Sequence, residues 1–347
     1  MATFHIGNRI ITPDSRPYII AEAGVNYENS IEIAEKMIVT AAHAGANAVK
    51  FQTYKSEKLA AADSPVYWNS NMTQKQFFAQ YDRFGQQEYE YLAQVCQREK
   101  VDFLSTPFDK EAVDLLEPLV PVYKIASADI TNKDLLCYVA SKNKPVILST
   151  GASTISEIAR AVEWLEKYGT PEIALLHCIL HYPASYEEIN LRSIQYLQEC
   201  FPKCIIGYSD HAYPDPGMSL LTAAAVIGAR IIEKHYTLDK TKSGNDHYHA
   251  MDESDLRLLS GNMDIISQSL GNKTIEITAE ELPARKYARR SVVTRIAIQQ
   301  GQPLTRKHVT CKRPGTGIKA EEIDYVIGRK PKVDVPPDTI LQWNMLE

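Results

Sequence analysis

The chain has 347 residues, 44% of them hydrophobic and 23% charged, and a formal net charge of −5 at pH 7. This composition is typical of a globular protein and argues against a chain that binds nucleic acid through its overall charge. The first residues, MATFH, lack the basic and apolar regions of a signal peptide, and no apolar run is long enough to span a bilayer. The six cysteines show no zinc-finger spacing. We therefore expect a reduced, cytoplasmic protein with neither nucleic-acid nor membrane partners.

Short β-branched runs alternate with amphipathic stretches along most of the chain. The runs do not alternate polar with apolar residues, which is typical of strands buried on both faces. Strands are predicted at 18–23, 48–52, 102–105, 122–126, 146–150, 173–178, 205–209 and 230–235. Helices are predicted at 31–43, 86–100, 110–116, 132–143, 155–168, 191–201, 219–228 and 255–270. Eight strand–helix units predict an α/β fold, a (β/α)8 TIM barrel over residues 1–271.

The predicted strands end in polar groups, and active sites of such barrels lie at those C-terminal ends. The strand-end residues are Glu22, Lys50, Gln52, Ser105, Thr106, Lys124, Ser127, Ser149, Thr150, His177, Cys178, Ser209, Asp210, His211 and His235. Any strand that returns to water turns polar, which accounts for the serines. It accounts poorly for Lys50 and Lys124, because apolar residues flank both, and a buried lysine needs an anion beside it.

Two histidines, His211 and His235, follow successive predicted strands. Each alone is more simply explained as a core or rim histidine. Their equivalent positions favour a shared metal site at the mouth of the barrel.

The composition and periodicity of the sequence change after residue 271. Residues 272–288 are polar without a clear period and are predicted to form a linker. Residues 289–347 contain short β-like pieces at 291–294, 310–312 and 332–335, separated by Gly and Pro turns. They predict a small all-β module of marginal size for independent folding.

Seven motifs, in order, resemble those of the sialic acid synthases. They are IAEAGVN at 20–26, VKFQ at 49–52, STPF at 105–108, YKIAS at 123–127, LSTG at 148–151, IGYSDH at 206–211 and EKH at 233–235. The C-terminal module, with KRPG at 312–315, resembles the antifreeze-like (SAF, β-clip) domain of those enzymes. The similarity runs from about residue 18 to the end of the chain.

The resemblance implies a metal-dependent condensation of phosphoenolpyruvate with an N-acetylated hexosamine, which releases phosphate. It implies that His211 and His235 bind a divalent metal, most simply Mn²⁺, with Mg²⁺ or Co²⁺ as alternatives. Glu22 matches an acid near the reacting carbons, and Asp129 stands where a second acid, usually glutamate, is found. The phosphoenolpyruvate and sugar contacts implied are Lys50, Gln52, Thr106, Lys124, Ser127, Ser149, Tyr182, Ser209 and Asp246. Arg313 matches an arginine that the partner subunit delivers in a domain-swapped homodimer.

The sugar side departs from the family pattern. Leu180 takes the place of an asparagine that contacts the sugar, and a leucine offers no hydrogen bond. His249 replaces a small residue, and we expect His247 and His249 to be loop residues rather than ligands of a second metal. The acceptor is therefore left open among N-acetylmannosamine, its 6-phosphate and a legionaminic- or pseudaminic-type sugar. A pyruvate-releasing barrel lyase and a non-catalytic carbohydrate-binding relic of the fold are the alternatives outside this reaction.

Overall fold

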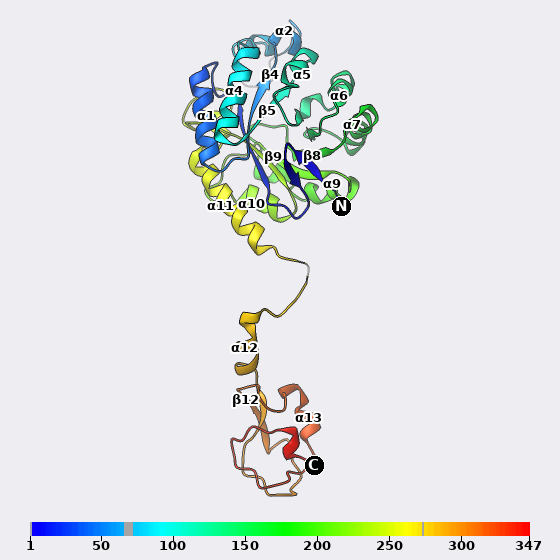
Figure 1. Ribbon diagram of the computed structural model, residues 1–347, viewed down its shortest axis with the longest axis vertical. Helices are drawn as coiled ribbons and strands as arrows, with labels where there is room; N and C mark the ends of the chain where they lie inside the picture. The colour runs from blue at the N-terminus through cyan, green and yellow to red at the C-terminus, as the bar shows by residue number, and fades with distance from the viewer. Residues whose placement is uncertain (1, 66–71, 273) are drawn as a thin grey trace. The chain divides into compact units, whose positions relative to one another are not determined.

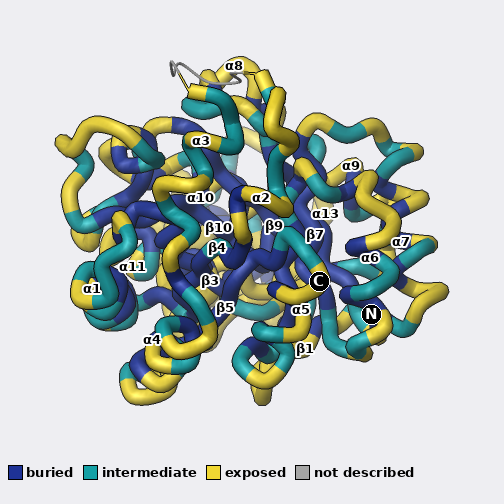
Figure 2. Tube along the Cα trace, turned by 90° about the horizontal axis from the view of Figure 1, so that it is seen from above, coloured by how far each residue is buried: buried dark blue, intermediate teal, exposed yellow. Residues whose placement is uncertain are grey.

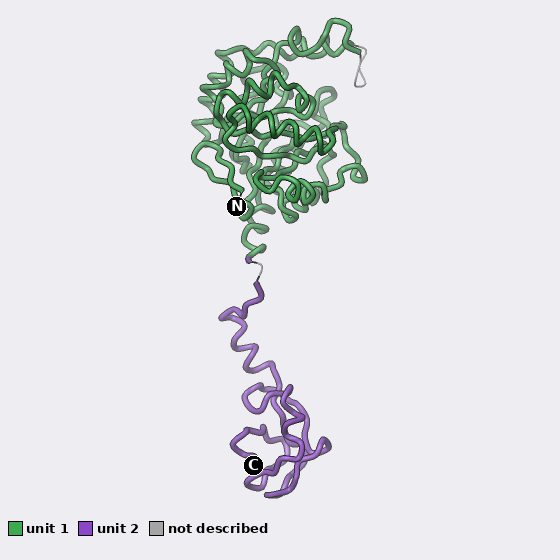
Figure 3. Tube along the Cα trace, turned by 90° about the vertical axis from the view of Figure 1, so that its right-hand side faces the viewer, with its two compact units in different colours: residues 1–271 green, residues 272–347 purple. Residues whose placement is uncertain are grey.

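The computed structural model describes residues 2–65, 72–272 and 274–347. It divides into two compact units, residues 1–271 and residues 272–347 (Figure 3). Each unit is described by itself.

The first unit is built on eight parallel strands (Figure 1). They are β3 (Tyr18–Gly24), β4 (Ala48–Thr53), β5 (Asp102–Pro107), β6 (Tyr123–Ile125), β7 (Val146–Ser149), β8 (Ile173–Cys178), β9 (Ile205–Asp210) and β10 (Ile231–His235). The hydrogen-bonded order is β5-β4-β3-β10-β9-β8-β7-β6, and the two outermost strands, β5 and β6, lie beside each other. The sheet is thus a nearly closed barrel, which confirms the predicted fold.

Helices follow the strands and surround the barrel. They are α1 (Ile31–His43), α2 (Ser56–Leu59), α3 (Gln74–Phe78), α4 (Gln86–Glu99), α5 (Lys110–Leu116), α6 (Lys133–Ala140), α7 (Ile155–Tyr168), α8 (Tyr186–Ile189), α9 (Ser193–Cys200), α10 (Ser219–Val226) and α11 (Glu253–Ser269). Local sequence sets their ends: Thr154 and Glu157 form a capping box at the start of α7, and Gly169 ends it in the left-handed conformation. Figure 2 shows the buried strands enclosed by helices whose outer faces are exposed.

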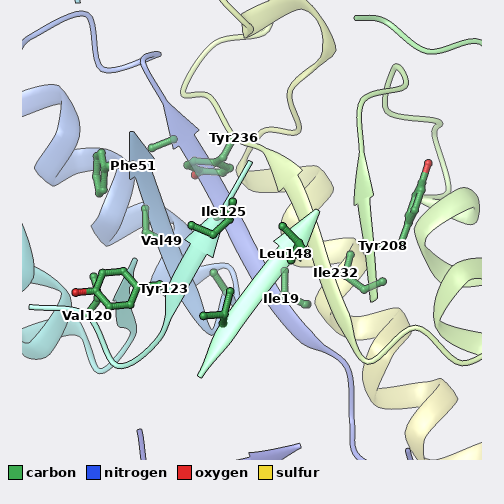
Figure 4. Packing of buried hydrophobic residues seen from close by; sticks show 14 of the residues in the cluster. Ile19, Val49, Phe51, Val120, Tyr123, Ile125, Leu148, Tyr208, Ile232 and Tyr236 are labelled. Atoms are coloured by element: carbon green, nitrogen blue, oxygen red, sulfur yellow. The ribbon is translucent and has the colours of Figure 1, made fainter. Parts of the chain in front are cut away.

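Side chains along each strand point alternately out of and into the barrel. Figure 4 shows the outward set, with Ile19, Val49 and Ile232 among the side chains of the large core between strands and helices. The inward set begins with an apolar layer at the N-terminal ends of the strands. This layer contains Ile20, Ala48, Leu104, Val122, Ile147, Leu176, Ile205 and Ile231. The inward residues that follow it along each strand are the polar ones.

A β-hairpin, unpredicted from the sequence, precedes the barrel. It pairs β1 (Phe4–Ile6) with β2 (Arg9–Ile11), and its Phe4, Ile6 and Ile11 join the apolar layer inside the barrel. Each of these strands has only three residues, which is too short to show an alternation of polar and apolar residues, so the sequence did not predict them. The hairpin closes the N-terminal end and leaves the C-terminal end open for a site.

The second unit pairs β11 (Ser291–Thr294) with β12 (Val309–Lys312) in antiparallel fashion around its own core. Residues 332–335 form no strand, because only Val335 pairs, in an isolated bridge with Ile298. The segment 272–288 contains a 3-10 turn, Ala279–Glu281, and α12 (Leu282–Tyr287); residue 273 lies outside the described residues. A last short helix is α13 (Ile323–Val326). Among the described residues of both units, none of the helices has the length and hydropathy of a membrane span.

Candidate active site

A cavity of about 570 Å³ opens at the C-terminal ends of the barrel strands. The inward-facing positions that continue the apolar layer supply its walls, because a spacing of two keeps them on the same face. Thus Ile20 leads to Glu22, and Ala48 leads to Lys50 and Gln52. The same two-residue spacing that buries the apolar layer at the N-terminal ends of the strands therefore directs the polar side chains into the cavity at their C-terminal ends.

Four buried charged side chains form the floor of this cavity. Lys50 Nζ lies 2.6 Å from Glu22 Oε2 and 3.7 Å from Glu233 Oε1. Lys124 Nζ lies 3.4 Å from the same Glu233 oxygen. Each of the four side chains is at most 6% exposed. The two lysines therefore share Glu233, and Lys50 also pairs with Glu22, with all four groups shielded from bulk water.

The pKa values of these groups show how the charges are balanced. Burial disfavours the Lys50 ammonium, but Glu22 and Glu233 outweigh it and raise the pKa of Lys50. Burial lowers the pKa of Lys124, and Glu233 compensates it only in part. Burial also raises the pKa of Glu22, with Lys50 acting in the opposite direction. Lys124 is thus the cation of the cluster that most lacks an anion.

Hydroxyl groups surround the two lysines. Lys50 Nζ donates to Thr106 Oγ1 at 3.3 Å, and Ser209 Oγ donates to Glu233 Oε1 at 3.1 Å. Ser127 Oγ accepts a hydrogen bond from the backbone N–H of Gly151 at 2.9 Å. The buried Ser149 Oγ has no hydrogen-bond partner in the part of the chain that the structure describes. These donors suit a small anion with several oxygens.

A group of aromatic rings lies at the other side of the cavity. The rings of His211 and His235 have centroids 5.6 Å apart, and Tyr182 packs against His211 at 4.0 Å. His211 Nδ1 lies 2.6 Å from the carbonyl oxygen of Ile179, which leaves its Nε2 as the ring nitrogen directed elsewhere. The structure thus brings the two predicted metal ligands together beside one tyrosine.

A second set of donor atoms gathers around His235. Ligand atoms of His235, Asp246 and His249 all lie within 4.8 Å of one another. Burial raises the pKa of Asp246 to about 6 and lowers the pKa of His249 to about 2, so His249 is neutral at pH 7. Neutral imidazoles and a carboxylate are ligands for a divalent transition metal, so the residues present fit such an ion.

An adjoining cavity of about 600 Å³ shares Gln52, Phe78, Tyr182 and His235 with the first. Its remaining walls are largely apolar or aromatic. They include Val25, Tyr54, Met72, Phe77, Asn245, Asp246 and Tyr248. Leu180 lines the first cavity next to Tyr182. The pair of cavities therefore joins a charged floor to an apolar outer chamber.

The structure brings together every barrel residue to which the resemblance gave a role, whereas the other strand-end residues Ser105, Thr150, His177 and Asp210 line neither cavity. Glu22, Lys50, Gln52, Thr106, Lys124, Ser127, Asp129, Ser149, Tyr182, Ser209, His211 and His235 line the first cavity, and Asp246 lines the second. Asp129 accepts a hydrogen bond from Asn132, and burial raises the pKa of its carboxyl group. Arg313 lies in the second unit.

Sequence reasoning gave no role to Glu233 and expected His249 to be a loop residue that binds no metal. Glu233 stands two residues before His235, so parity alone places both on the inward face of β10. His249 lies in a loop beyond any strand, where no period could reveal that it turns toward His235.

A barrel with polar groups at the C-terminal ends of its strands, followed in the sequence by a small β-rich unit, is the architecture of a class of (β/α)8 enzymes with an appended module. The sequence matches the NeuB family over residues 37–275 and the SAF domain over residues 289–347. The chain therefore belongs to the NeuB family.

Individual relatives agree with this assignment. The chain is 36% identical to an uncharacterized protein of Methanocaldococcus jannaschii, over 100% of this chain and 99% of the relative. It is 35% identical to the N,N'-diacetyllegionaminic acid synthase of Campylobacter jejuni, over 93% and 98% of the two chains. A crystal structure of N-acetylneuraminic acid synthetase from Leptospira borgpetersenii, in complex with citrate, is 35% identical with a TM-score of 0.73. That similarity covers 81% of this chain and 94% of the other.

Proposed function

We propose that this protein condenses phosphoenolpyruvate with an N-acetylated hexosamine-type aldose, giving a nine-carbon 2-keto-3-deoxy acid and phosphate. The observation that carries the proposal is the convergence of Lys50 and Lys124 with a histidine pair in one cavity. Relatives named as sialic-type and legionaminic-type acid synthases support the same reaction class.

The lysine side of the cavity is the proposed site for phosphoenolpyruvate. This substrate carries a carboxylate and a phosphate, and the under-compensated Lys124 offers it a buried cation. Thr106, Ser127 and Ser149 add hydroxyl donors around the lysines. A bound anion would add the negative charge near Lys124 that Glu233 supplies only in part.

The histidine side is the proposed site for the aldehyde end of the sugar. His211 and His235 would hold a divalent metal, for which Mn²⁺ is the first choice. When bound, the metal supplies Lewis-acid polarisation of a carbonyl oxygen. Tyr182 packs against His211 and fixes its ring.

Carboxyl groups at the same cavity supply the acid–base chemistry. Carbon–carbon bond formation at C3 of phosphoenolpyruvate leaves C2 electron-deficient, and water then adds there before phosphate leaves. Glu22 is the proposed base for that water, because burial raises its pKa toward the range where a base works best. Asp129, whose pKa is also raised by burial, is the second candidate.

Leu180 and the apolar outer chamber favour an acceptor of the legionaminic type over N-acetylmannosamine. Such a sugar carries a deoxy carbon and a second acetamido group in place of hydroxyls, and therefore needs fewer hydrogen bonds from the wall. Leu180→Asn should raise kcat/KM for N-acetylmannosamine relative to a 2,4-diacetamido-2,4,6-trideoxyhexose. An unchanged ratio would remove Leu180 from the specificity argument.

We also propose a domain-swapped homodimer in which Arg313 serves the partner's site. The N-terminal segment of the second unit exposes several apolar side chains, which a partner surface would cover. These are Ile275, Ile277, Leu282 and Tyr287. Mixing Arg313→Ala chains with His211→Ala chains should restore about a quarter of the parent activity, since half the dimers are mixed and one of two sites is intact in each. Failure to restore activity would exclude action in trans.

Phosphate release from phosphoenolpyruvate in the presence of Mn²⁺ tests the reaction itself. The acceptor panel comprises N-acetylmannosamine, its 6-phosphate, mannose and 2,4-diacetamido-2,4,6-trideoxyhexoses. Release that depends on one acceptor and disappears in His211→Ala supports the proposal. Tight phosphoenolpyruvate binding without release from any acceptor would favour the binding-only alternative, and absence of binding would end the synthase proposal.

A further inference from the structure

The imidazole ring of His249 is fully buried. It is 0% exposed, and neither Nδ1 nor Nε2 has a partner within the described ranges. A buried polar atom without a hydrogen-bond partner destabilises the fold. A phenylalanine would fill the same space without that cost, so packing alone gives no reason for an imidazole.

The loop that carries His249 is fixed on both sides of it. His247 contacts Thr237 Oγ1 at 2.7 Å through Nδ1 and Glu28 Oε1 at 3.3 Å through Nε2. The backbone N–H of Met251 donates to the carbonyl oxygen of His235 at 2.8 Å. The position of His249 is therefore set by its neighbours, and its ring is free to serve a ligand.

The ring of His249 lies against that of His235, with centroids 4.8 Å apart. Asp246 Oδ2 is 3.3 Å from His235 Nδ1. We infer that Asp246 and His249 bind a divalent transition-metal ion together with His235. This deepens the proposed function, because it gives the metal of that site two further protein ligands.

The chemistry of the three groups narrows the ion. Together with His211, the three groups would form a set of three imidazoles and one carboxylate, which leaves positions of a six-coordinate ion open for substrate or water. Mg²⁺ prefers an all-oxygen shell, whereas Mn²⁺ and Co²⁺ accept imidazole nitrogen. Ligand bonds of roughly 2.0–2.2 Å allow donors at most about 4.4 Å apart. Donor atoms already within 4.8 Å need only small side-chain rotations to reach such an ion.

A direct contact between His235 and Asp246 without metal is the competing explanation. It accounts for the 3.3 Å contact but leaves both nitrogens of His249 without a function. The metal accounts for all three side chains at once.

Titration of the metal-free, full-length protein with Mn²⁺, followed by the electron paramagnetic resonance of free Mn²⁺, tests the inference without any substrate. Loss of an outer-shell partner costs roughly 10- to 100-fold in metal affinity, so loss of a ligand should cost at least as much. We expect His249→Ala and Asp246→Asn each to weaken Mn²⁺ binding at least about tenfold. His181→Ala, which alters an exposed histidine, should bind Mn²⁺ like the parent.

His249→Gln guards against loss of fold, since it keeps the polar volume but not the imidazole. Parent-like Mn²⁺ affinity in folded His249→Ala and His249→Gln would overturn the inference, as would absence of Mn²⁺ binding by the parent. Metal-dependent phosphate release by a parent protein whose His249 variants bind Mn²⁺ normally would leave the proposed function standing and remove this inference alone.

Discussion

Replacing Lys124 with methionine should separate ligand binding from stability. Lys124 Nζ is 3.4 Å from Glu233 Oε1, and at an effective dielectric constant of 20 that pair attracts by about 5 kcal/mol. The lowered pKa of Lys124 shows that burial and the nearby Lys50 outweigh this attraction. The charged lysine is therefore held at a net cost in the ligand-free protein.

The methionine variant removes that cost and leaves Glu233 paired with Lys50 at 3.7 Å. Stability should consequently change by no more than about 1 kcal/mol, well below the 3–5 kcal/mol expected when a buried charge loses its partner. Phosphoenolpyruvate should lose one charge-assisted hydrogen bond, worth about 1.5–3 kcal/mol. Its Kd should rise roughly 10- to 150-fold.

Calorimetric titration with phosphoenolpyruvate and thermal unfolding of the same preparation measure the two effects. Lys110→Met is the matched control, because Lys110 pairs with Asp134 at the surface and lines neither cavity. Phosphoenolpyruvate affinity should also fall as the pH rises through the lowered pKa of Lys124, since only the ammonium form attracts the anion. Unchanged affinity in Lys124→Met, or a loss of stability of 3 kcal/mol or more, would refute this reasoning.

Three further substitutions test the scaffold. Phe4→Ala should destabilise the barrel by about 3–5 kcal/mol, seen as a lower unfolding midpoint, because Phe4 is 0% exposed in the hairpin that closes the barrel. Burial raises the pKa of Asp252, but hydrogen bonds from Ser254 and Lys240 lower it to about 2. Asp252→Ala should therefore cost about 1 kcal/mol at pH 7 through loss of the α11 cap, and unfolding curves should show this difference shrinking as the pH falls from roughly 4 to 2. Gly207→Ala should sharply reduce the yield of folded protein, because its Cβ would collide with a backbone carbonyl of β10; a parent-like melting curve would contradict the pairing of β9 with β10.

The sequence predicted the barrel because its signal is repeated in every strand. Each strand carries inward apolar residues followed by inward polar ones, and a spacing of two keeps them aligned. Lys50 and Lys124 could be recognised as site candidates because each is a charged residue within a strand whose neighbouring residues are apolar and buried. Site residues on the strands could therefore be predicted from the sequence. Glu233 was missed, although its spacing of two residues from His235 places it on the same inward face of β10.

Elements without a period could not be predicted in this way. The hairpin of β1 and β2 is too short to show alternation, and residues 332–335 had a strand-like composition without a continuous partner. His249 lies in a loop whose path is set by the contacts of His247 with Thr237 and Glu28. Its approach to His235 is a product of the tertiary fold, so only coordinates reveal it.

Charge balance links the proposed metal to the proposed dimer. The floor of the cavity holds two lysines and two glutamates, whose formal charges cancel. Phosphoenolpyruvate brings a charge of about −2.5 to −3 at pH 7, which is costly to bury without further cations. A divalent metal and one arginine would supply +3, the amount that the barrel lacks.

Removal of the metal should therefore weaken phosphoenolpyruvate binding itself, in addition to stopping turnover. Titration of the protein with phosphoenolpyruvate, with Mn²⁺ and again after chelation, measures this directly. Equal affinities in the two titrations would show that the floor accommodates the anion unaided, in which case Glu22 or Glu233 must take up a proton as the ligand binds. Burial already raises the pKa of Glu22, whereas the two lysines lower that of Glu233, so Glu22 is the group that would then be protonated. A protonated Glu22 could not act as the base for water, and that role would pass to Asp129.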